Sequence, residues 1–62
     1  MHYYTVHIRV NGEEWGEYRI LAKNRETSCF LAGMKFQREE TSYAGDYITA
    51  DSVPDPTNEE VI

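Results

Sequence analysis

Residues 3–12, Tyr-Tyr-Thr-Val-His-Ile-Arg-Val-Asn-Gly, decide the fold of this chain. Apolar side chains occupy every second position of the first eight residues: Tyr4, Val6, Ile8 and Val10. A period of two among β-branched and aromatic residues is typical of a β-strand with one buried face. Asn11-Gly12 follows at once, and both residues tolerate the positive φ of a tight hairpin turn. The stretch therefore predicts a strand that reverses direction at Asn11-Gly12.

The returning strand is predicted over residues 15–22, with an apolar side formed by Tyr18, Ile20 and Ala22. A two-residue loop would pair each residue i with residue 23−i and bring Glu17 and Arg19 onto the apolar face of the first strand. A three-residue loop over residues 10–12, with a left-handed glycine, pairs i with 22−i instead. Tyr4 then faces Tyr18, and the charged side chains share the opposite face. The apolar pattern therefore favours the three-residue loop.

Residues 25–38 have the spacing of an amphipathic helix, and Asn24 is a favourable N-cap for it. The face predicted to be buried consists of Cys29, Phe30, Ala32, Gly33 and Phe36. Leu31 and Met34 form a second, narrow apolar strip. This strip either packs beneath the loop at 41–46 or against the C-terminal residues, or it serves self-association.

A third strand is predicted over residues 46–53, with Ile48 and Ala50 on its apolar side. The helix carries the chain back over the sheet, so the second and third strands should run parallel with the first strand between them. The predicted fold is α+β, a small two-layer ββαβ domain with a three-stranded sheet and one helix packed on one face.

Residues 1–53 are predicted to form this single domain. Residues 54–62, with two prolines and several acids, are predicted to be a flexible acidic tail.

Composition excludes several classes of protein. The 62 residues carry a net charge of −5 and include one cysteine, which cannot form an internal disulfide. No apolar run approaches the ~20 residues that span a bilayer. No basic-then-apolar signal segment follows Met1. We therefore expect a small cytoplasmic protein with no membrane contact.

Side chains suited to catalysis are poorly placed. Cys29 lies on the predicted buried face of the helix, where a thiol packs rather than reacts. His2 and His7 differ in sequence parity, so they point to opposite sides of their strand and form no ready metal pair. The sequence has no glycine-rich phosphate loop and no serine–histidine–acid arrangement. We therefore predict no catalytic, cofactor-binding or metal-binding residues.

The single helix covers only one face of the sheet, so the other face is expected to be open. The side chains predicted to lie on it are Tyr3, Thr5, His7, Arg9, Trp15, Glu17, Arg19, Tyr47 and Thr49. Aromatic residues and arginine supply most of the energy of protein interfaces. The residues expected to bind a partner are therefore Tyr3, His7, Arg9, Trp15, Arg19 and Tyr47. Cross-strand pairs that only stabilise the sheet account for the same side chains.

The predicted function is that of a non-enzymatic acidic module, an accessory or inhibitory factor that binds another protein or a second copy of itself. Charge is uneven, because residues 1–38 carry +2 and residues 39–62 carry −7. One alternative is therefore an acidic nucleic-acid mimic that blocks a DNA- or RNA-binding protein, although acids that only keep a small domain in solution explain the same charges. The other is single-stranded nucleic-acid binding by stacking on the aromatic face. Acidic charge repels phosphates, which makes nucleic acid the less favoured partner. Small size and acidity also fit a factor of viral or mobile-element origin.

Overall fold

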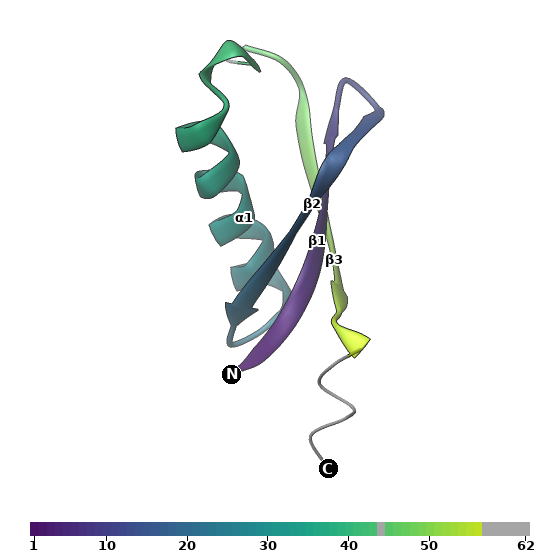
Figure 1. The fold of residues 1–62 in the computed structure, drawn as a ribbon, viewed down its shortest axis with the longest axis vertical. Helices are drawn as coiled ribbons and strands as arrows, with labels where there is room; N and C mark the ends of the chain where they lie inside the picture. The colour runs from purple at the N-terminus through teal and green to yellow at the C-terminus, as the bar shows by residue number, and fades with distance from the viewer. Residues whose placement is uncertain (44, 57–62) are drawn as a thin grey trace.

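The computed structural model describes residues 1–43 and 45–56. Its elements, in chain order, are β1 (His2–Val10), β2 (Glu13–Ala22), α1 (Arg25–Glu39), the 3-10 helix η1 (Thr41–Tyr43) and β3 (Ile48–Pro54). The strand order is β2-β1-β3, and β1 runs antiparallel to both neighbours. The helix α1 lies against one face of this sheet (Figure 1). The predicted α+β fold, with three strands and one helix in ββαβ order, is confirmed.

The hairpin between β1 and β2 closes through a two-residue turn. Asn11 and Gly12 have φ values of 53° and 84°, and Val10 pairs with Glu13 across them. Positive φ at both central positions gives a turn whose twist matches that of the flanking strands. The three-residue loop predicted over residues 10–12 is therefore wrong.

A β-bulge in β2 then restores the separation of the two faces. Arg9 pairs with Glu14, but the preceding residue of β1, Ile8, pairs with Gly16. Trp15 is thus the extra residue of the bulge. Farther along the hairpin, every partner lies two positions beyond the predicted one. Because the shift is even, the side chains keep the faces that the alternation predicts, although the individual pairs were predicted wrongly.

The core lies between α1 and the even-numbered side of the sheet. Its buried hydrophobic side chains are Tyr4, Val6, Ile8, Ala22, Ala32 and Phe36. The helix begins at the predicted cap, where the side-chain oxygen of Asn24 accepts a hydrogen bond from the Thr27 N–H at 2.8 Å. Phe30, predicted to flank the buried face, is instead 66% exposed, whereas Ser28 is fully buried.

Two small polar side chains bring α1 close to β3. The hydroxyl oxygens of Ser28 and Ser52 lie 2.6 Å apart in the core. Ser28 Oγ also lies 2.6 Å from the Arg25 carbonyl oxygen. Because a hydroxyl has one proton, Ser28 donates to that carbonyl and accepts from Ser52. Larger side chains at these two positions would hold the helix away from the strand.

The folded part of the chain continues past residue 53. Pro54 is the last residue of β3, an edge strand, where a missing N–H is tolerated. Asp55 is only 7% exposed, and its backbone N–H donates to the Tyr3 carbonyl at 3.1 Å. The first two residues of the predicted tail at 54–62 are therefore held by the sheet. Residues 57–62 lie outside the described residues.

Candidate functional site

The odd-numbered side of the sheet faces away from α1, and we call it the open face. Its side chains are Tyr3, Thr5, His7 and Arg9 from β1, Glu17, Arg19 and Leu21 from β2, and Thr49, Asp51 and Val53 from β3. Four of the six residues predicted to bind a partner lie on this face: Tyr3, His7, Arg9 and Arg19.

Arg19 is held in one position on the open face. Its guanidinium carbon lies 3.7 Å from the centre of the Tyr3 ring, and its Nε donates to a carboxylate oxygen of Asp55 at 3.1 Å. The Thr5 hydroxyl donates to the same oxygen at 3.3 Å. The buried carboxylate therefore orients the guanidinium through a charged hydrogen bond. We call these four residues the Arg19 clasp.

An apolar patch borders the Arg19 clasp. Leu21 is 45% exposed, and Tyr3 and Val53 are exposed as well. Leu21 pairs with Tyr3, and Val53 pairs with Thr5, so the three apolar side chains come from adjacent strands at one end of the sheet. Neither Leu21 nor Val53 is among the six residues predicted to bind a partner. The alternation along each strand nevertheless places both on the open face.

The other half of the open face is polar. His7 pairs with Glu17 on one side and with Asp51 on the other, and its Nδ1 lies 3.6 Å from a Glu14 carboxylate oxygen. Arg9 is exposed in the next row. Charges of both signs alternate here, so this half offers ion pairs and hydrogen bonds but no apolar anchor.

Trp15 does not lie on the open face, which corrects the prediction. Its ring meets the Phe36 ring of α1 edge to face, with centroids 4.8 Å apart, and the Tyr18 ring lies 5.8 Å away. The bulge is the cause, because the extra residue interrupts the strict alternation of β2 and turns Trp15 towards the helix. The open face therefore lacks the largest aromatic side chain that was predicted to be there.

Tyr47 is 71% exposed but lies far from Tyr3. Its backbone N–H donates to Asn11 Oδ1 at 3.1 Å, and its carbonyl accepts from the Asn11 N–H at 2.7 Å. These bonds place Tyr47 beside the hairpin turn. The length of β1 between Tyr3 and Val10, about 20 Å, separates the two tyrosines. They do not form one stacking surface.

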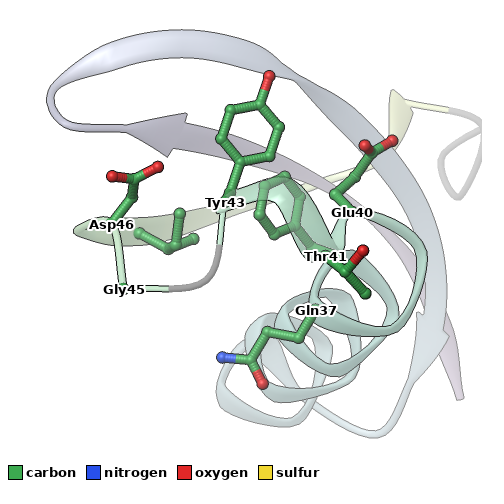
Figure 2. Close-up of a pocket in the computed structure, with 8 residues that line it drawn as sticks. Gln37, Glu40, Thr41, Tyr43, Gly45 and Asp46 are labelled. Atoms are coloured by element: carbon green, nitrogen blue, oxygen red, sulfur yellow. The ribbon is translucent and has the colours of Figure 1, made fainter.

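A hollow of about 360 Å³ opens at the hairpin end of the molecule, between the end of α1, η1 and the start of β3 (Figure 2). Figure 2 shows the Tyr43 ring between the carboxylates of Glu40 and Asp46. A second hollow, of about 480 Å³, shares Tyr43 and Asp46 and is also lined by Glu13 and Glu14. The carboxylates make this end of the molecule attractive to a cationic group.

The outer side of α1 carries three exposed apolar side chains: Phe30, Leu31 and Met34. Leu31 is 38% exposed and Met34 more so, and thus the described residues of the loop at 41–46 do not cover them. Elsewhere on the helix, the Cys29 thiol is partly buried and donates to the Ala50 carbonyl at 3.8 Å. These surroundings are those of a packed side chain rather than of a nucleophile.

Within residues 1–43 and 45–56, no three His, Cys, Asp or Glu side chains are arranged to hold a metal ion. No helix in these ranges is long and apolar enough to cross a membrane. Comparison of the chain with protein-family models, curated proteins and solved structures returned no match. Function is therefore inferred from the chemistry of the chain's own surfaces.

Proposed function

We propose that this chain is a non-enzymatic protein-binding module of the cytoplasm, an accessory or inhibitory factor that covers a partner's surface with its open face. The apolar patch around the Arg19 clasp carries this proposal. Interfaces derive most of their energy from aromatic and arginine side chains surrounded by apolar contacts, which is the composition of this patch. The single cysteine, Cys29, has no disulfide partner and suits a reducing compartment.

The Arg19 clasp supports protein binding because it is organised before any partner arrives. An arginine that is free to move loses side-chain entropy when it binds. Arg19 already stacks on Tyr3 and bonds to Asp55, so its side chain is ordered by folding and loses little further entropy when a partner binds. Leu21 and Val53, both exposed beside the clasp, supply apolar contact.

The arrangement of the aromatic side chains makes single-stranded nucleic acid a weaker candidate. Bases stack on aromatic rings whose faces are free. Tyr3 is the single aromatic side chain on the open face of the described sheet, and the Arg19 guanidinium covers one side of its ring. Trp15 packs against Phe36 instead. The net charge of −5 further opposes contact with phosphates.

An acidic mimic of nucleic acid is the second candidate, and the two acidic hollows favour it. Glu13, Glu14, Glu40 and Asp46 gather at the hairpin end of the molecule. Asp55, however, is bonded within the Arg19 clasp at the other end of β1 and does not contribute to this cluster. This candidate predicts a basic partner and binding that weakens steeply as salt is added.

A pair of matched charge substitutions on β3 tests the open-face proposal. Val53→Glu places a charge in the apolar patch, whereas Thr49→Glu places the same charge on the same strand and face but in the polar half. A protein retained from a cell lysate by the wild-type chain is titrated against both variants. We expect Val53→Glu to weaken binding about tenfold or more and Thr49→Glu to leave it nearly unchanged.

A third variant, Glu40→Gln/Asp46→Asn, tests the acidic candidate separately, because both carboxylates line the first hollow and neither belongs to the open face. Binding that survives Val53→Glu but is lost with this variant, or in high salt, contradicts the open-face proposal and supports the mimic. Equal effects of Val53→Glu and Thr49→Glu contradict both the patch and its location. Urea unfolding of each variant shows whether its fold is intact.

A further inference from the structure

The outer edge of β2 is the longest strand edge without a partner among the described residues. β2 pairs only with β1 there, so its other row of backbone N–H and C=O groups faces outward. β3 is shorter and ends in Pro54, which has no N–H to donate. Beyond the bulge at Trp15, residues 17–22 keep one register and contain neither proline nor glycine. This stretch is a template for one more antiparallel strand.

We infer that the added strand is β2 of a second copy of the chain, related to the first by a twofold axis beside Ile20. In this pairing residue i faces residue 40−i, so Glu17 of each copy faces Lys23 of the other, the residue that directly follows β2, and the two charges meet at each end of the new strand pair. Opposite charges directly across a strand pair are stabilising, and the symmetry makes this pair occur twice. The product is a dimer with one continuous sheet that contains β1, β2 and β3 of both copies.

The neighbouring registers are less favourable. An axis beside Arg19 would place the two arginines directly opposite each other, and like charges in that position are destabilising. An axis beside Tyr18 would bring the bulge at Trp15 into the new strand pair, and a bulge disrupts the ladder of hydrogen bonds. The axis beside Ile20 avoids both and places Leu21 opposite Arg19 of the second copy.

The helix above β2 supplies an apolar contact at the same axis. Lys35 Nζ lies 5.5 Å from the centre of the Tyr18 ring, so this side of α1 is turned towards β2. Leu31 is one turn earlier on the same side, about 6 Å back along the helix. Ile20 lies about 7 Å beyond Tyr18 along β2. Because α1 runs back over the sheet from the end of β2 (Figure 1), the two offsets have the same direction, and Leu31 is expected at about the level of Ile20.

The twofold axis therefore brings Leu31 of one copy to face Leu31 of the other. Both the charge pair and this apolar contact are self-complementary, as a twofold interface requires, and this selects a second copy over an unrelated strand. Leu31 and the adjacent Met34 are exposed in the single chain. Covering them adds apolar burial to a 62-residue chain, whose own core is necessarily small.

Sedimentation equilibrium of the full chain over a range of concentrations tests this dimer. Glu17→Lys is expected to raise the dissociation constant about tenfold or more, because two symmetry-related pairs change at once. Glu17→Lys/Lys23→Glu restores opposite charges and is expected to return the wild-type constant. Leu31→Glu is expected to give monomers. Phe30→Glu, its matched control, places the same charge about 100° around the helix and should leave the dimer intact.

Several outcomes overturn the proposal. The proposal is contradicted if the wild-type chain stays monomeric at every concentration. It is also contradicted if neither Glu17→Lys nor Leu31→Glu changes the dissociation constant of the dimer. A double charge swap that stays as weak as Glu17→Lys also overturns it. Circular dichroism shows whether each variant folds. Val53→Glu lies on the far strand from this contact and should not change the dimer, so failure of the dimer and failure of the open-face proposal are distinguishable.

Discussion

The indole of Trp15 meets the ring of Phe36 edge to face, with their centroids 4.8 Å apart and their planes at 88°. Phe36 also packs against Tyr43, whose ring centroid lies 5.5 Å away. One aromatic residue from the bulge of β2, one from α1 and one from η1 thus close the core at the hairpin end. Edge-to-face pairs of this kind add stabilisation beyond the area that they bury.

Replacing Trp15 is expected to destabilise the fold. Trp15→Ala should lower the free energy of unfolding by roughly 2–4 kcal/mol, because the half-buried ring loses its contacts with Phe36 and Tyr18. Trp15→Phe should lower it less, and Tyr47→Ala, which truncates an exposed ring, should change it little. Urea unfolding measures all three. A Trp15→Ala protein as stable as Tyr47→Ala would contradict the packing of Trp15 against Phe36 and would indicate that Trp15 is exposed.

The Arg19 clasp predicts an unequal effect of two neutralised acids. Asp55→Asn should lower the free energy of unfolding by roughly 1–2 kcal/mol, because the carboxylate that accepts from Arg19 and Thr5 is lost. Asp51→Asn changes the net charge equally but removes an exposed carboxylate on β3, four residues before Asp55, and it should have little effect. Thermal unfolding compares the two variants. Equal effects would contradict the clasp.

Tyr18 predicts a loss of stability in alkali. Burial raises the pKa of its hydroxyl above the ordinary value, and the carboxylates of Glu39 and Glu40 raise it further. As pH rises, the unfolded chain therefore releases this proton before the folded chain does. The contribution of the neutral Tyr18 hydroxyl to the free energy of unfolding is complete below about pH 10 and is lost as pH rises through the pKa of the folded state. Tyr18→Phe should remove that part of the decline, measured as the free energy of unfolding against pH.

The same variant has a predicted effect at neutral pH. The Tyr18 hydroxyl oxygen is buried without a hydrogen-bond partner among the described residues. Tyr18→Phe should therefore leave stability unchanged or raise it by up to about 1 kcal/mol. Tyr47→Phe is the control, because its side chain is exposed. A loss of stability with Tyr18→Phe at neutral pH would show that the hydroxyl has a partner.

The hairpin turn predicts an order of stability at residue 11. Asn11→Gly keeps the positive φ but loses the bond that Oδ1 accepts from the Tyr47 N–H, which should cost about 1 kcal/mol. Asn11→Ala loses the same bond and also strains the backbone, so it should cost roughly 1 kcal/mol more. Unfolding in urea gives the order. Equal stability of the two variants would contradict a positive φ at this position.

Most of the fold follows from patterns that act over short distances. Alternation along residues 3–10, the Asn11-Gly12 turn and the Asn24 cap each specify local structure, and together they leave one arrangement of three strands and a helix. The position of the extra hairpin residue is different. Whether the extra residue lies in the turn or in β2, the side chains of residues 16–22 keep the same faces, so the alternation cannot distinguish the two. The contact between Trp15 and Phe36, which accompanies the position in β2, joins residues distant in sequence and is not visible in a local pattern.

The sequence predicted which residues lie on the open face wherever the alternation of a strand alone determines the face, as it does for Tyr3 and Arg19. Asp55 was missed because it stands between two prolines in an acidic stretch, which is typical of a tail. Its odd number continues the alternation of Asp51 and Val53, and this is the signal that could have found it. Phe30 was misplaced because its hydrophobicity was weighed above the helical period: it is two residues, about 200°, from both Ser28 and Ala32, which are buried, and therefore lies on the outer side of α1.

The central position of β1 has a consequence for how the chain is made on the ribosome. β1 is synthesised first, but the strand on its second side is synthesised after β2 and α1. The bond between Thr5 and Asp55 spans 50 positions, so the sheet cannot close until residue 55 has left the exit tunnel. Until then one edge of β1 is available to other nascent chains. Any delay between the emergence of β1 and that of residues 48–55 would lengthen this exposed interval.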